Sequence, residues 1–77
     1  MMKHRFEFHA RDIDPAERIK WCRANLGERG VRWDFAGALN SVVIMIRTDK
    51  DAEAYNKAWR FWNVLKGNCK TETHRIS

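Results

Sequence analysis

The sequence predicts an α+β fold in which two helices cover one face of an antiparallel sheet. Two segments carry helix-start signals and an apolar face with the period of a helix. Three other segments carry the alternation or the apolar run that is typical of strands. Their order is β-α-β-β-α, and the C-terminal residues permit a fourth strand. This order is that of the ferredoxin-like fold, a split β-α-β sandwich.

The first strand is expected at residues 5–9, where polar and apolar side chains alternate. The first helix follows, with Asp14 as its N-cap and Pro15 at its first helical position. We expect this helix to continue to about Leu26, because Gly27 can supply the left-handed residue that ends a helix.

The next two strands are expected to form a hairpin. Residues 31–35 alternate, whereas residues 41–46 are apolar on both faces, as in a central or doubly covered strand. A turn at residues 37–40 would join them.

The second helix is expected to begin after Thr48, whose hydroxyl is a good N-cap and precedes two acids in the first turn. It would continue to about Lys66 and end at Gly67. Residues 69–76 include two threonines and permit a weak final strand.

Length and composition predict a single domain that spans residues 1–77. Hydrophobic residues make up 44% of the chain, which argues against disorder. No run of 18 apolar residues is present, and the N-terminus lacks the apolar core of a signal peptide, so we expect a cytoplasmic protein. Two distant cysteines, Cys22 and Cys69, do not suggest a disulfide framework.

The sequence offers no constellation for catalysis. Its histidines, His4, His9 and His74, are scattered and lack the spacing of zinc ligands. The acids gather near helix starts, where capping explains them without acid–base chemistry. No glycine-rich phosphate loop or nucleophile motif is present. We therefore expect no enzyme, no metal and no cofactor.

The charge pattern is more informative about function, because the net charge is +5. Cations interleaved with an aromatic side chain are typical of proteins that bind RNA or single strands, where phosphates give affinity and rings stack on bases. A solvated basic face is the commoner meaning of such a run. The predicted contact residues lie on the first helix and the loop after it: Arg18, Lys20, Trp21, Arg23, Arg29 and Arg32.

Trp21 has two interpretations. Helical spacing places it nearly opposite the apolar stripe of Ile19, Cys22 and Leu26, on a face expected to meet solvent. It is therefore either an exposed ring for stacking, or a ring covered by the tail or by the loop at residues 28–30.

The second helix carries aromatic and apolar side chains over about half its circumference, wider than one sheet requires. Its outer members, Trp59 and Phe61, are predicted to contact a partner, such as a second copy of the chain. The alternative is that strand ends and the tail cover them.

The sequence differs from one RNA-binding family with this fold and resembles a second group of proteins. An RNA recognition motif needs aromatic rings on its third strand, and residues 41–46 have none; only Phe6 and Phe8 could imitate its other motif. The chain also resembles small accessory proteins of tailed bacteriophages. The residues that carry this resemblance are Trp21-Cys22, Gly27, the run Gly30-Val31-Arg32-Trp33, and residues 51–54 before Trp59. That resemblance implies a host-takeover or anti-defence product that binds or inhibits a host system, and it transfers no site residue. Trp33 could equally be a structural residue at a strand entry.

The leading hypothesis is thus a non-enzymatic protein that binds RNA or another nucleic acid, as a phage-type accessory or inhibitor in the host cytoplasm. The alternative is an inhibitor that docks on an acidic host protein, or an oligomer that binds an anionic signal molecule.

Overall fold

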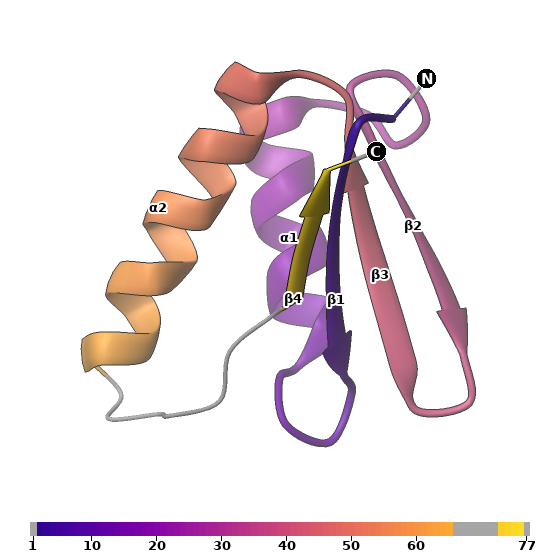
Figure 1. Ribbon diagram of the computed structural model, residues 1–77, viewed down its shortest axis with the longest axis vertical. Helices are drawn as coiled ribbons and strands as arrows, with labels where there is room; N and C mark the ends of the chain where they lie inside the picture. Colours follow the sequence, from indigo (N-terminus) through magenta and orange to yellow (C-terminus); the bar gives the residue numbers. More distant parts are fainter. Residues whose placement is uncertain (1, 66–72, 77) are drawn as a thin grey trace.

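The computed structural model describes residues 2–65 and 73–76. Its helices lie together against one face of a four-stranded antiparallel sheet (Figure 1). The strand order β2-β3-β1-β4 confirms the predicted ferredoxin-like fold, with β4 as the fourth strand. In chain order the elements are β1 (His4–His9), α1 (Pro15–Leu26), β2 (Trp33–Ala38), β3 (Ser41–Ile46), α2 (Asp49–Leu65) and β4 (Thr73–Ile76).

The helix ends follow the predicted signals. The Asp14 carboxylate accepts a hydrogen bond from the backbone N–H of Ala16 at 3.0 Å, and Gly27 ends α1 with a φ of 87°. The Thr48 hydroxyl accepts from the backbone N–H of Asp51 at 3.3 Å. The expected end of α2 at Lys66 and Gly67 lies outside the described residues.

Strand β2 begins two residues later than predicted and continues to Ala38. The cause is a turn before it: Gly30, with a φ of 99°, donates its N–H to the carbonyl of Trp33 at 2.7 Å. The hairpin is correspondingly tighter than predicted, with Leu39 in the left-handed region at a φ of 54°.

The core lies between the sheet and the helices. Residues at alternate positions of β1 are buried, and the intervening side chains point to the uncovered face of the sheet, which we call the open face. Trp33 belongs to the core: it is completely buried and its indole N–H donates to the carbonyl of Gly27 at 2.8 Å. It is therefore a structural residue at the strand entry. The buried apolar residues are Phe6, Phe8, Ile13, Cys22, Leu26, Trp33, Ile44, Ile46, Ala52, Tyr55 and Trp59.

Candidate nucleic-acid interface

The structure does not gather the predicted contact residues on one face. Arg18 and Trp21 turn toward α2, Lys20 lies beside them, and Arg23 lies elsewhere on α1. Arg29 and Arg32 belong to the loop between α1 and β2, where carboxylates pair with both.

Arg18 was expected to face solvent, and this is wrong. Its side chain is buried, and its guanidinium carbon lies 3.7 Å from the centre of the Trp59 ring. Arg18 precedes Cys22 by one helical turn, so the two share the inward face of α1. The long aliphatic part of the arginine then packs in the interior while its charged end lies on the indole.

Trp21 is half-buried, and within the described residues its ring packs on α2, which was not among the expected covers. Its ring contacts α2, with its centre 5.6 Å from that of Tyr55 and 6.4 Å from that of Trp59. Both contacts are edge-to-face, an arrangement that aromatic pairs prefer. Trp21 is thus part of the packing between the helices.

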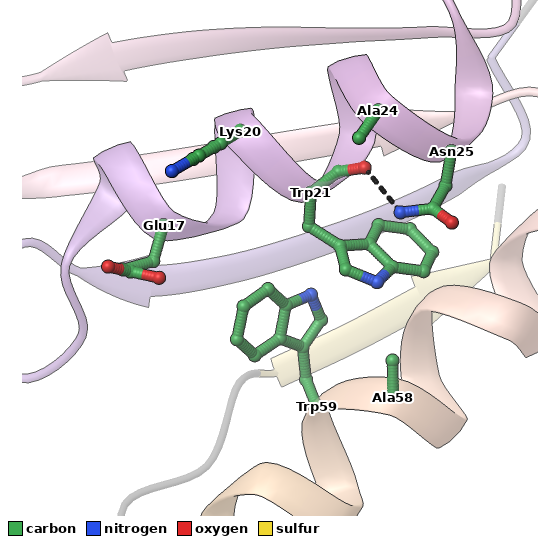
Figure 2. A pocket seen from close by; sticks show the side chains of 7 residues that line it. All are labelled: Glu17, Lys20, Trp21, Ala24, Asn25, Ala58 and Trp59. Atoms are coloured by element: carbon green, nitrogen blue, oxygen red, sulfur yellow. Dashed lines mark hydrogen bonds between the residues drawn. The ribbon is translucent and has the colours of Figure 1, made fainter.

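Beside these rings lies a groove of about 440 Å³ between α1 and α2. Figure 2 shows the two indoles side by side between the helices, with Lys20 and Glu17 along α1. Because the Trp21 and Trp59 rings already contact each other at 63°, no nucleobase fits between them. The residues that line the groove are Glu17, Lys20, Trp21, Ala24, Asn25, Ala58 and Trp59.

Arg23 is exposed but does not extend this surface. It follows Trp21 by two residues, which separates the two side chains by roughly 160° around the helix axis. A flat ligand on Trp21 would therefore not reach Arg23.

Arg29 is occupied within its own loop. Its Nε lies 2.6 Å from the Asp34 carboxylate, and its guanidinium carbon lies 4.2 Å from the centre of the Phe35 ring. The Arg29 hydrogen bond is the main reason that the pKa of Asp34 lies below its ordinary value.

Arg32 is occupied as well. It makes two hydrogen bonds to the Asp51 carboxylate, of 2.6 Å and 3.0 Å, and so joins the loop to the first turn of α2. The bonds from Arg32 hold the pKa of Asp51 below its ordinary value. Both loop arginines thus have a carboxylate partner.

Two arginines that the sequence did not single out face each other on the open face of the sheet. The register pairs Arg5 of β1 with Arg75 of β4, and both are exposed. Arg5 is also paired with Met45 on its other side, and Met45 with Asp34. Paired residues across antiparallel strands have their Cβ atoms about 5 Å apart. We call Arg5 and Arg75 the arginine pair.

Neither member of the arginine pair makes an ion pair within the part of the chain that the structure describes; the exposed carboxylate of Glu7 lies on the same face, two residues along β1 from Arg5. No carboxylate of residues 2–65 or 73–76 lies within ion-pair distance of either guanidinium. The exposed Arg47, which follows β3, lies at the same end of the sheet, as does Lys3, whose charge is paired with Asp49 at 3.1 Å. This end therefore has a concentration of positive charge.

The prediction of a partner surface on α2 is wrong for Trp59. Its side chain is 7% exposed, because α1 covers the ring with Arg18 and Trp21. Trp59 is core, and its own chain covers it. The Phe61 side chain lies outside the described residues.

The register also brings together two of the histidines that seemed scattered. His4 Nδ1 lies 2.9 Å from His74 Nε2, although the residues are 70 positions apart. His4 is buried and His9 is exposed, so these two lie on different faces, as their parity predicted. Among the described residues, no group of three histidine, cysteine or acidic side chains could hold a metal ion.

The open face differs from that of an RNA recognition motif. Phe6 and Phe8 are both in the core, on the opposite face of β1. The open-face side chains of β1 and β3 include no phenylalanine, tyrosine or tryptophan. They are Arg5, Glu7, His9, Ser41, Val43 and Met45.

Comparison of the chain with protein-family models, with curated proteins and with solved structures gives no match. Within the described residues, no helix has the length and apolar character needed to cross a membrane.

Proposed function

We propose that the protein is a non-enzymatic RNA-binding module that contacts the phosphate backbone through the open face of its sheet. The observation that carries this proposal is the arginine pair, Arg5 opposite Arg75, exposed and without a carboxylate partner among the described residues. The proposed contact surface is therefore the open face of the sheet, in place of the surface on α1 that the sequence predicted.

Electrostatics favours an anion at this position. Like charges directly opposite each other on neighbouring strands destabilise a sheet. A phosphate between Arg5 and Arg75 would turn that repulsion into two attractive contacts, since a guanidinium presents paired N–H donors that match phosphate oxygens. Arg47 would add to the field that attracts a polyanion to the same end.

The open face predicts little sequence preference. Base recognition on a sheet depends largely on aromatic rings, and β1 and β3 present no phenylalanine, tyrosine or tryptophan there, with His9 at the far end of β1. Val43 and Met45 are half-buried and offer only apolar surface to sugars or bases. Contacts to the backbone position a nucleic acid but do not specify it, so the expected binding is sequence-tolerant and strongly salt-dependent.

The test is a titration of labelled single-stranded and duplex RNA at several salt concentrations. Arg5→Gln and Arg75→Gln should each weaken binding to different sequences alike. Each should also flatten the slope of log K against log salt by about 0.7 for a single strand. Neither change should lower stability, because each removes a like-charge repulsion on an exposed face. Arg23→Gln is the matched control: it removes the same charge from an exposed position on α1.

Two outcomes would overturn the proposal. If wild-type protein shows no salt-sensitive binding to either RNA, the arginine pair serves another anionic partner. An inhibitor of an acidic host protein, or an oligomeric binder of an anionic signal molecule, is then the better function. If Arg23→Gln costs as much affinity as Arg5→Gln, binding is a diffuse effect of net charge and the sheet is not its site.

A further inference from the structure

A chain of polar contacts joins the last strand to the second helix through a buried histidine. His4 Nε2 lies 2.7 Å from Asp49 Oδ1, and His4 Nδ1 lies 2.9 Å from His74 Nε2. The His74 ring lies parallel to the Phe6 ring, with the ring centres 4.2 Å apart. His74 is thus held at one nitrogen by His4 and along its face by the core.

The number of protons on this pair decides whether its hydrogen bond survives. The bond needs a hydrogen on one of the two facing nitrogens and a lone pair on the other. With both rings neutral, His4 donates to Asp49 and His74 donates to His4. One added proton, on either ring, still leaves one donor facing one acceptor. A second added proton places N–H groups and like charges against each other.

Strand β4 depends on this contact more than the other strands do. It is an edge strand that pairs only with β1, over four residue pairs. Its side chains at positions 73–76 are exposed, so burial contributes little to holding it. His74 is the residue of β4 that the structure shows in contact with both a polar group and a core ring.

We propose that the His4–His74 pair makes the docking of β4 acid-sensitive: β4 stays paired while the pair holds at most one added proton, and detaches when it takes a second. The inference concerns the fold and does not depend on the proposed RNA binding.

The charged groups around the His4–His74 pair support this limit of one added proton. From α2, Asp49 faces His4, and Lys3 contacts the same carboxylate at 3.1 Å. Hydrogen bonds from His4 and then Lys3 hold the pKa of Asp49 below its ordinary 3.8, so it stays ionised in mild acid. Arg5 and Arg75 lie on the opposite face, and Ile46 and Ile76, the sheet neighbours of His4, carry no charge.

The direction of the effect follows from His74. The partial desolvation of His74 where its ring contacts Phe6 and His4, and then the charge of His4, lower the pKa of His74 from its ordinary 6.5. A detached β4 binds that proton more readily than a docked one. Docking is therefore complete above about pH 6.5 and weakens as the pH falls below that value.

The test is NMR at pH values from about 7.5 to about 5, which covers the range where histidine titrates. Amide exchange, corrected for the intrinsic effect of pH, should show protection at residues 73–76 falling by about tenfold or more. Protection in β3 should stay constant. Nitrogen shifts of the imidazoles should show a hydrogen on one of the two facing nitrogens at neutral pH and on both of them in acid.

His74→Phe is the informative variant, because a phenyl ring keeps the stacking on Phe6 and cannot be protonated. Its β4 amides should keep their protection across the range. His9→Gln, on the open face, is the control and should behave as wild type. The proposal fails if wild-type β4 stays protected at about pH 5, or if His74→Phe loses protection to the same extent as wild type.

Discussion

The guanidinium of Arg18 lies 3.7 Å from the centre of the Trp59 ring, and the arginine is only 2% exposed. A charged side chain therefore packs between α1 and α2, at a position where a small domain would ordinarily have an apolar side chain. The same contact removes Arg18 and Trp59 from the two surfaces that the sequence had predicted for partners.

Arg18→Ala should lower the free energy of unfolding by about 2 kcal/mol. The change removes a desolvated cation–π contact, worth up to about 2 kcal/mol, and the packing of the aliphatic stem. Arg18→Met keeps most of the stem and should fall between Arg18→Ala and wild type. Urea denaturation measures both, with Arg23→Ala as an exposed control expected within about 0.5 kcal/mol of wild type. An Arg18→Ala midpoint equal to that of the control would contradict the packing described.

Trp59→Ala should lower the free energy of unfolding and leave the sedimentation coefficient unchanged. Emptying a buried tryptophan site typically costs about 3–5 kcal/mol. Sedimentation velocity and urea denaturation on the same samples separate this from a partner role. A shift from dimer to monomer at full stability would restore the predicted interface at Trp59. Phe61→Ala remains the test of association at the other predicted residue.

Trp21→Ala should cost roughly 1–2 kcal/mol of stability, because a half-buried ring loses edge contacts with Tyr55 and Trp59. Trp21→Phe keeps part of both contacts and should lose less. The predicted stacking role would give a different result: full stability, and a loss of about 1–3 kcal/mol in affinity for single-stranded RNA.

The fold was predictable because its signals are local. Asp14 and Thr48 cap the helices from adjacent positions, and residues 41–46 form β3 with the expected bounds. The start of β2 was missed because the Gly30 turn depends on a hydrogen bond to Trp33, which no periodicity reveals.

The candidate site was not predictable in the same way. Helical spacing placed Arg18 outside, since charged side chains are seldom buried, but α2 offers an indole for its guanidinium. The arginine pair and the histidine pair each join residues 70 positions apart, and only the β1–β4 register brings them together. The alternation of the first strand indicated that Arg5 faces solvent. Nothing in the local sequence indicated that Arg75 lies opposite it.

Each helix cap should contribute about 1 kcal/mol. Thr48→Ala and Asp14→Ala remove acceptors that the structure shows bound to backbone N–H groups. Asp14→Asn keeps an acceptor of similar rank and should cost little. Chemical denaturation is the measurement, and an unchanged midpoint with an unchanged slope would show that the cap in question does not hold its helix.

The Arg32–Asp51 pair should make stability depend on pH in the acid range. The folded pKa of Asp51 is lowered from 3.8, first by the Arg32 hydrogen bonds and also by that of Thr48. A lowered folded pKa means that the contribution is present above about pH 4 and is lost as the pH falls through the folded value. Arg32→Gln should therefore destabilise the domain at neutral pH and lose most of that effect near pH 2.

The comparison needs denaturation midpoints for wild type and Arg32→Gln at both pH values, with Arg23→Gln to report the general effect of one lost cation. Net charge rises as all carboxylates take up protons, so a charge effect alone would favour both variants in acid to the same extent. The ion pair predicts a difference between the two variants that is large at neutral pH and small in acid. A difference that stays constant with pH would mean that Arg32 acts through the packing of its stem, and that the carboxylate of Asp51 contributes through Thr48 alone.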